Sequence, residues 1–75
     1  AARLRTFRHV DLAQIAGVIE DFYGIGVAFR SEALKNIQFT GTLDFNIPID
    51  HILEVLPLST NTRITRNGEK ITIHK

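Results

Sequence analysis

The chain has 75 residues, 44% of them hydrophobic and 23% charged, which is typical of one small folded domain and not of a disordered segment. The net charge of +1 hides an uneven distribution, because residues 1–9 and 59–75 are basic while the segment between them is acidic. The absence of cysteine excludes disulfides and thiolate metal sites, and no apolar run approaches the roughly 20 residues that a membrane-spanning helix needs.

The first expected elements are a strand over residues 3–9 and a helix that follows it directly. Asp11 can cap this helix, with Gln14 three residues later as in a capping box. Apolar residues then recur at helical spacing, at Leu12, Ile15, Ala16, Ile19 and Phe22. Gly24 supplies a left-handed stop, and residues 25–29 follow as a short apolar strand.

A second strand-helix-strand segment repeats the first. Residues 37–45 alternate apolar with polar residues, which is typical of a strand with one buried face. Apolar residues at and just before the first helix have apolar counterparts 37 positions later. Val10 corresponds to Ile47, Leu12 to Ile49, Ile15 to Ile52, Ala16 to Leu53, Val18 to Val55 and Ile19 to Leu56. Gly24 corresponds to Asn61, which also tolerates a left-handed backbone. The sequence therefore predicts a duplicated unit.

The repeat is imperfect in the strands before the helices. Phe7 corresponds to Asp44, and its natural equivalent Phe45 lies one position further on. A one-residue insertion or bulge in the first strand explains this slip. Gly41, inside the predicted strand, marks a bulge or the close approach of a packed helix.

The apolar stripe of each helix is wide, covering roughly 160° of the helix surface at 100° per residue. Both helices are therefore expected to touch two layers. Asn67-Gly68 is a strong hairpin signal between a strand that contains Ile64 and a last strand over residues 70–75. The expected fold is α+β, with the order β-α-β-β-α-β-β.

No arrangement of residues points to catalysis. Phosphate-loop spacing, a nucleophile elbow and a metal-binding triplet are all missing, and His9, His51 and His74 lie far apart in the sequence. Glu20 and Asp21 diverge as helix neighbours and cannot act as an acid-base pair. We expect no enzyme activity, no cofactor and no metal.

Two binding hypotheses remain. Arg63, Arg66 and Lys70 on the terminal hairpin favour single-stranded nucleic acid, but the hairpin has no aromatic residue on which bases could stack, so this is the weaker alternative. Protein binding by strand addition needs an exposed sheet edge, and residues 3–9 and 70–75 are the candidate edge strands. The candidate partner-binding residues on them are Arg3, Arg5, Lys70, Thr72 and His74. The same charges could equally serve to block association.

The chain resembles the C-terminal domain of FecR-type anti-sigma factors along nearly its whole length. The resemblance rests on FRHVDLAQI, FYGIGVAF, IQFTGTLDFNIPIDHILEVL and TRITRNGEKITIHK, and it is most specific at residues 39–42, 52–56 and 68–73. The chain is similar, more loosely, to the signalling domains at the N-termini of secretins and TonB-dependent receptors.

The resemblance implies a fold with two helices sandwiched between two small sheets, as a single domain over residues 1–75. It further implies a periplasmic module of a single-pass inner-membrane protein, of which this chain is a fragment. The protein partner would be the signalling domain of a TonB-dependent outer-membrane receptor, and an absent cytosolic part would bind a sigma factor. The alternative is that the chain is itself the N-terminal signalling domain of such a receptor or of a secretin.

Overall fold

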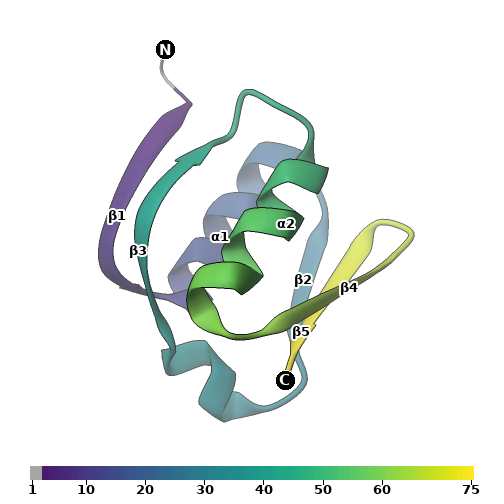
Figure 1. Ribbon diagram of the computed structural model, residues 1–75. Coiled ribbons are helices and arrows are strands. Elements are labelled where there is room, and N and C mark those ends of the chain that lie inside the picture. Colours follow the sequence, from purple (N-terminus) through teal and green to yellow (C-terminus); the bar gives the residue numbers. More distant parts are fainter. Residues whose placement is uncertain (1–2) are drawn as a thin grey trace.

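The computed structural model describes residues 3–75, whose elements follow the expected order with one short addition (Figure 1). They are β1 (Leu4–Asp11), α1 (Leu12–Tyr23), β2 (Gly26–Phe29), the 3-10 helix η1 (Glu32–Asn36), β3 (Gln38–Asp44), α2 (Ile49–Thr60), β4 (Arg63–Asn67) and β5 (Lys70–His74).

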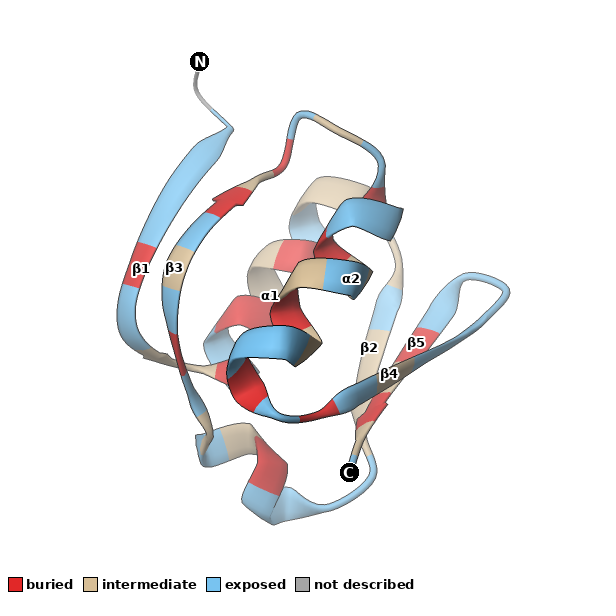
Figure 2. Ribbon diagram, viewed as in Figure 1, coloured by how far each residue is buried: buried red, intermediate tan, exposed pale blue. Residues whose placement is uncertain are grey.

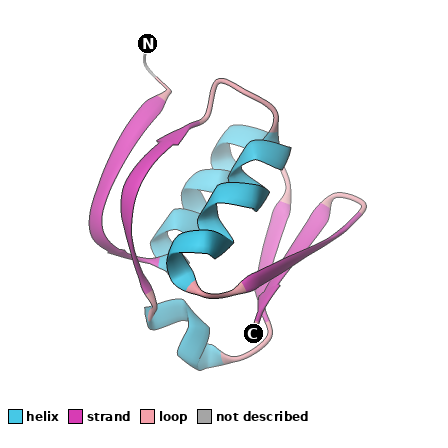
Figure 3. Cartoon of the chain, in the orientation of Figure 1, coloured by secondary structure: helices cyan, strands magenta, loops and turns pink. Residues whose placement is uncertain are grey.

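The fold is α+β, with two helices between two small sheets (Figure 3). One sheet consists of β1 and β3, which pair antiparallel. The other has the order β2-β5-β4, with β2 parallel and β4 antiparallel to β5. α1 and α2 lie side by side between the sheets, so the predicted arrangement is confirmed, and the wide apolar stripes are explained by contact with a sheet on each side.

The duplication is confirmed at the level of the helices. Shifting the bounds of α1 by 37 residues reproduces the bounds of α2. Both helices end at a residue with left-handed backbone, Gly24 at φ 65° and Asn61 at φ 56°. The halves differ before the helix, because β1 runs directly into α1 whereas residues 45–48 separate β3 from α2.

The expected irregularity of the first strand is a β-bulge. Phe7 pairs with Gly41 and Val10 with Phe39, so β1 uses one residue more than β3 over the same distance. His9, within the bulge, has φ 52°, and its N–H donates to Thr40 Oγ1 at 3.0 Å. The bulge accounts for the slip in the repeat.

The core lies between the two sheets and draws on both halves of the chain. Figure 2 shows buried segments on the inward sides of the helices and strands. The central cluster consists of Phe7, Leu12, Ile15, Ile19, Phe39, Leu43, Phe45, Ile49, Ile52, Leu56 and Ile73. Thr60 and Thr62 are also buried, and their hydroxyls are 2.8 Å apart and hydrogen-bonded to each other. Buried polar groups in the core are thus paired with each other.

Two local expectations are wrong in part. Asp11 lies at the N-cap position of α1, but its side chain makes no capping bond and instead accepts from Gln38 Nε2 at 3.4 Å. The α1 N-terminus is instead stabilised by a backbone bond from Leu12 N–H to Ile37 O at 2.8 Å. Of the two readings of Gly41, the bulge is supported, because the register shift begins next to its partner Phe7, whereas the packed helix is not, because the nearest atoms to a Cβ there belong to Phe39 of its own strand.

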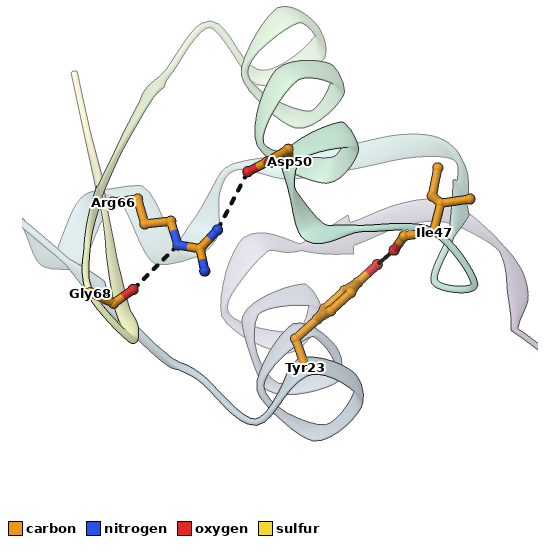
Figure 4. Close-up of polar contacts among 5 residues, drawn as sticks. All are labelled: Tyr23, Ile47, Asp50, Arg66 and Gly68. Atoms are coloured by element: carbon orange, nitrogen blue, oxygen red, sulfur yellow. Dashed lines mark hydrogen bonds and ion pairs between the residues drawn. The ribbon is translucent and has the colours of Figure 1, made fainter.

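A polar contact links the end of α1 to the start of α2. The Tyr23 hydroxyl, at the end of α1, donates to Ile47 O at 2.7 Å, just before α2 begins (Figure 4). Burial, and next the negative charge of Asp44, raise the pKa of Tyr23 above its usual 10.0, while Arg3 opposes them. The hydroxyl therefore stays protonated and remains a donor at neutral pH.

Candidate protein-interaction surface

The first predicted edge strand lies where the sequence places it. Arg3 immediately precedes β1 and Arg5 lies within it. β1 belongs to a two-stranded sheet, so one of its edges pairs with β3 and no strand among residues 3–75 pairs with the other. Leu4, Arg5 and Thr6 are all exposed. The edge position of β1 is confirmed, and a role in partner binding stays a prediction.

The second predicted edge strand is not an edge. β5, with Lys70, Thr72 and His74, lies in the middle of its sheet between β2 and β4. The parallel pairing with β2 aligns Val27 with Ile71, and Ile71 and Ile73 are buried. A terminal strand that is apolar on one face gains more burial in the centre of a sheet than at its border. The expected edge position of these residues is therefore wrong.

The side chains predicted on β5 contact their own sheet or solvent. His74 Nε2 is hydrogen-bonded to Thr65 Oγ1 at 2.8 Å across the β4–β5 pair. Thr72 is half-buried, while Lys70 is exposed near the hairpin turn. The structure thus separates Arg3 and Arg5, on one sheet, from Lys70, Thr72 and His74, on the other.

Arg3 and Arg5 cover an aromatic pair at the end of α1. Their guanidinium carbons lie 5.7 and 5.6 Å from the centre of the Phe22 ring. Phe22 in turn stacks on the buried Phe45, with ring centres 4.8 Å apart and planes 10° apart. Cation–π contacts at exposed sites contribute about 0.5–1 kcal/mol each. These contacts hold two positive charges at the free side of β1.

A hollow of about 210 Å³ opens between β1 and α1. It is lined by Arg5 from the strand and by Val18, Asp21 and Phe22 from the helix. Its lining combines two apolar side chains, Val18 and Phe22, with one charged residue of each sign. Such a combination suits the docking of an apolar side chain whose neighbours are polar.

The outer edge of β2 is occupied by a side chain of the domain itself. Val27 N–H donates to the Glu20 carboxylate at 2.9 Å. Glu20 reaches it from α1, which precedes β2. A charged side chain bonded to an edge amide competes with an incoming strand. This edge is therefore less available than that of β1.

The basic hairpin shows internal contacts and no stacking platform. Arg66 Nε donates to Gly68 O at 3.3 Å and its Nη1 lies 3.4 Å from Asp50 Oδ1 (Figure 4). Arg63 and Lys70 are exposed. β4 and β5 contain no aromatic side chain apart from His74, so the geometry does not favour base stacking.

The three histidines do not converge. His9 lies in the bulge, His51 on the exposed side of α2 and His74 in β5. Within residues 3–75 there is no group of three or more His, Cys, Asp or Glu side chains placed to hold a metal ion. Over the same residues, neither helix has the length and apolar character to cross a membrane.

Sequence reasoning missed the helix residues that complete the β1 surface. Val18 and Phe22 were assigned only to the apolar stripe of α1, yet both are only half-buried and line the hollow. Glu20 is exposed, and its carboxylate also accepts a hydrogen bond from the β2 edge, which the sequence did not indicate. The one available signal was the position of Val18 and Phe22 at the margin of a wide apolar stripe, because residues at such a margin lie at the boundary between core and solvent.

The geometry defines a small α+β domain, with a core between two sheets and a charged edge strand. The sequence pattern described as "FecR, C-terminal" matches residues 5–73, and the chain belongs to this family. The resemblance found in the sequence is thereby confirmed.

Two crystal structures of a proposed anti-sigma factor from Parabacteroides distasonis ATCC 8503 have the same fold, at TM-scores of 0.82 and 0.83. Each is 17% identical to this chain, and the match covers 96% of this chain. The chain spans about a third of those structures, 34% and 33%. No curated protein sequence matches the chain.

Proposed function

We propose that this chain is the periplasmic protein-binding domain of a FecR-type anti-sigma regulator. In this role it binds the signalling domain of a TonB-dependent outer-membrane receptor and relays receptor occupancy to a membrane-anchored protein. The cytosolic part of that protein would bind a sigma factor. Membership of the FecR C-terminal family is the observation that carries the proposal.

The structure supports a binding role more than a catalytic one. The largest polar feature of the β1 surface is a pair of arginines on an aromatic ring, and no nucleophile with an adjacent base lies near them. The free edge of β1 provides unpaired backbone groups, which partner strands use for recognition. The combination suits a protein ligand.

The binding test is calorimetric titration of the domain with the N-terminal signalling domain of each TonB-dependent receptor encoded nearby. We expect one of these receptor domains to form a saturable one-to-one complex with the chain. The matched control is the signalling domain of a receptor from an unrelated signalling system, which should bind at least tenfold more weakly. Absence of heat with every receptor signalling domain encoded nearby would contradict the proposal.

The relay can be tested in cells that carry the full-length regulator and a reporter driven by the sigma factor. Deletion of the domain should uncouple the reporter from receptor occupancy while the regulator is still produced. A reporter that responds normally without the domain would contradict a relay role. The full-length product also separates this proposal from the alternative of a receptor signalling domain, because a regulator must carry a membrane span and a cytosolic part.

The positive charge of the β4–β5 hairpin makes single-stranded nucleic acid the alternative ligand. Binding through Arg63, Arg66 and Lys70 requires an affinity that falls steeply with salt. We expect labelled single-stranded oligonucleotides to show unchanged fluorescence polarisation with the domain at low salt. A polarisation rise that salt abolishes would favour the nucleic-acid function instead.

A further inference from the structure

Each helix is flanked by one outer strand from each sheet. α1 contacts β1 and β2, while α2 contacts β3 and β4 (Figure 1). β1, β2, β3 and β4 are all outer strands, since only β5 is central. The domain therefore has two comparable sides, one at α1 and one at α2, on which a partner strand could add.

The β1 edge presents backbone groups on the α1 side. Arg3 O accepts from Phe45 N–H at 2.8 Å, which turns the backbone groups of Arg3 towards β3. Because these groups alternate in direction along a strand, the N–H and C=O of Leu4 and Thr6 point to the free edge. The neighbouring edge of β2 is occupied by the bond from Val27 N–H to Glu20. Of the two edges on this side, β1 is the one prepared for pairing.

The side chains beside this edge form a groove with a pocket. Arg5, Val18, Asp21 and Phe22 line an open hollow of about 210 Å³. Arg5 lies two residues from the buried Phe7, so both side chains are on the same face of the sheet. A partner strand paired with β1 would place every second side chain on this face, in the groove. The hollow has room for one apolar side chain beside Val18 and Phe22.

Gly17, which directly precedes the pocket-lining Val18, leaves open space beside α1. Glycine is among the least favourable residues in a helix interior. A Cβ on Gly17 would have no atom within 4 Å other than its own helix, so packing inside the domain gives no reason for a glycine. The equivalent residue of α2, 37 positions on, is Glu54. The open space at the partly exposed Gly17 allows close approach of another backbone to α1.

The positive charges on and next to β1 favour an acidic ligand. Arg3, Arg5 and Arg8 all lie on or next to β1, and the first two are held over Phe22. Asp21 is the acidic residue lining the pocket. A strand that places carboxylates next to these arginines gains charge-assisted hydrogen bonds, whereas a basic strand is repelled.

We propose that the groove between β1 and α1 binds an acidic, extended segment of the partner protein. This segment adds as a strand to the edge at Leu4 and Thr6, inserts one apolar side chain into the hollow beside Val18 and Phe22, and pairs its carboxylates with Arg3 and Arg5. The inference rests on the proposed function as a protein-binding domain. It names the surface and the chemistry of the segment that this surface takes.

The location can be mapped by backbone NMR of the domain during titration with each receptor signalling domain encoded nearby. We expect slowed hydrogen exchange at the Leu4 and Thr6 amides and shifts at Gly17, Val18 and Phe22. If a receptor domain binds but the changes are confined to β3, β4 and α2, the groove is overturned while the proposed function stands. If no receptor domain binds, the proposed function itself fails.

Two pairs of variants separate the groove from the rest of the surface. Gly17→Gln places a side chain in the open space of α1 next to Val18, and Glu54→Gln places the same side chain at the equivalent position of α2. Arg5→Glu and Arg63→Glu change the net charge equally, on β1 and on β4. We expect Gly17→Gln and Arg5→Glu to weaken binding at least tenfold, and each control to stay within twofold of the unmodified domain. Equal effects within a pair would overturn the proposal, provided that circular dichroism shows all four variants folded.

Discussion

Gly41 is the residue for which the fold leaves least choice. A Cβ at this position would lie 2.9 Å from Phe39 Cζ, and the backbone φ of 156° is one that side chains rarely adopt. The Phe39 ring is 2% exposed and has no free space into which to move. We expect Gly41→Ala to lower the free energy of unfolding by about 1–3 kcal/mol, as overpacked core substitutions do. Urea unfolding at neutral pH measures the loss.

Gly26 provides the matched control for this prediction. It also lies in a strand, but a Cβ there would meet only Lys70 Cγ, at an ordinary contact distance of 3.9 Å. Gly26→Ala should therefore change stability by less than about 1 kcal/mol, in either direction. Equal losses in the two variants would show that strand glycines matter for another reason than contact with Phe39.

Tyr23 makes stability depend on pH in the alkaline range. Burial and Asp44 raise its pKa in the folded domain, so the folded state binds this proton more tightly than the unfolded chain does. The resulting stabilisation is complete below the unfolded value of 10.0 and is lost as the pH rises through the higher folded value. Tyr23 is the single tyrosine of the chain, so tyrosinate absorbance reports its titration directly.

Tyr23→Phe tests the hydrogen bond and the titration together. At neutral pH we expect it to cost about 0.5–1.5 kcal/mol, because Ile47 O loses its donor. Above pH 10 the difference between the variant and the parent should shrink, since the ionised hydroxyl no longer donates. A difference that grows with pH, or tyrosinate formation in the folded domain below pH 10.0, would contradict the assignment.

At the scale of elements, the helices were predictable because their signals are local. Periodic apolar residues and the left-handed residues Gly24 and Asn61 define both helices, and the repeat of 37 residues made each support the other. The position of β5 was not predictable in this way. Its neighbour β2 lies more than 40 residues away in the sequence, and the alternation of Ile71 and Ile73 shows that one face is buried without showing which strands flank it.

The Glu20 side chain is predicted to protect the outer edge of β2. Glu20→Ala removes the acceptor of the Val27 amide and leaves a short apolar strand with an open edge. We expect faster hydrogen exchange at the Val27 amide and self-association that grows with protein concentration. NMR exchange and sedimentation velocity measure the two effects.

Glu54→Ala is the control for the edge prediction. It also removes one exposed glutamate from a helix, but Glu54 lies on α2 and its side chain has no hydrogen-bond partner among residues 3–75. The Val27 amide and the sedimentation coefficient should not change. An unchanged exchange rate at Val27 in Glu20→Ala would show that the carboxylate does not protect this edge.

At the scale of the whole molecule, the layers followed from the sequence but the surface did not. A helix stripe of roughly 160° requires contact on two sides, whichever strands supply it. The β1 groove depends on side chains from β1 and α1 that meet only after folding, as Arg5 and Phe22 do. Charge on the first strand was visible beforehand; the pocket and the bare helix surface at Gly17 were not.

The repeated sequence does not divide the domain into two independently stable halves. β1 pairs with β3, β2 pairs with β5, and the central cluster takes residues from both halves. A chain of fewer than about 40 residues rarely buries enough surface to fold alone. We therefore expect peptides 1–37 and 38–75 each to be unfolded by circular dichroism, whereas residues 1–75 unfold in one cooperative transition with coincident helical and tyrosine signals. A cooperative thermal transition in either peptide, or two separated transitions in the intact chain, would show that one half carries a core of its own and that the strand pairs between the halves are secondary.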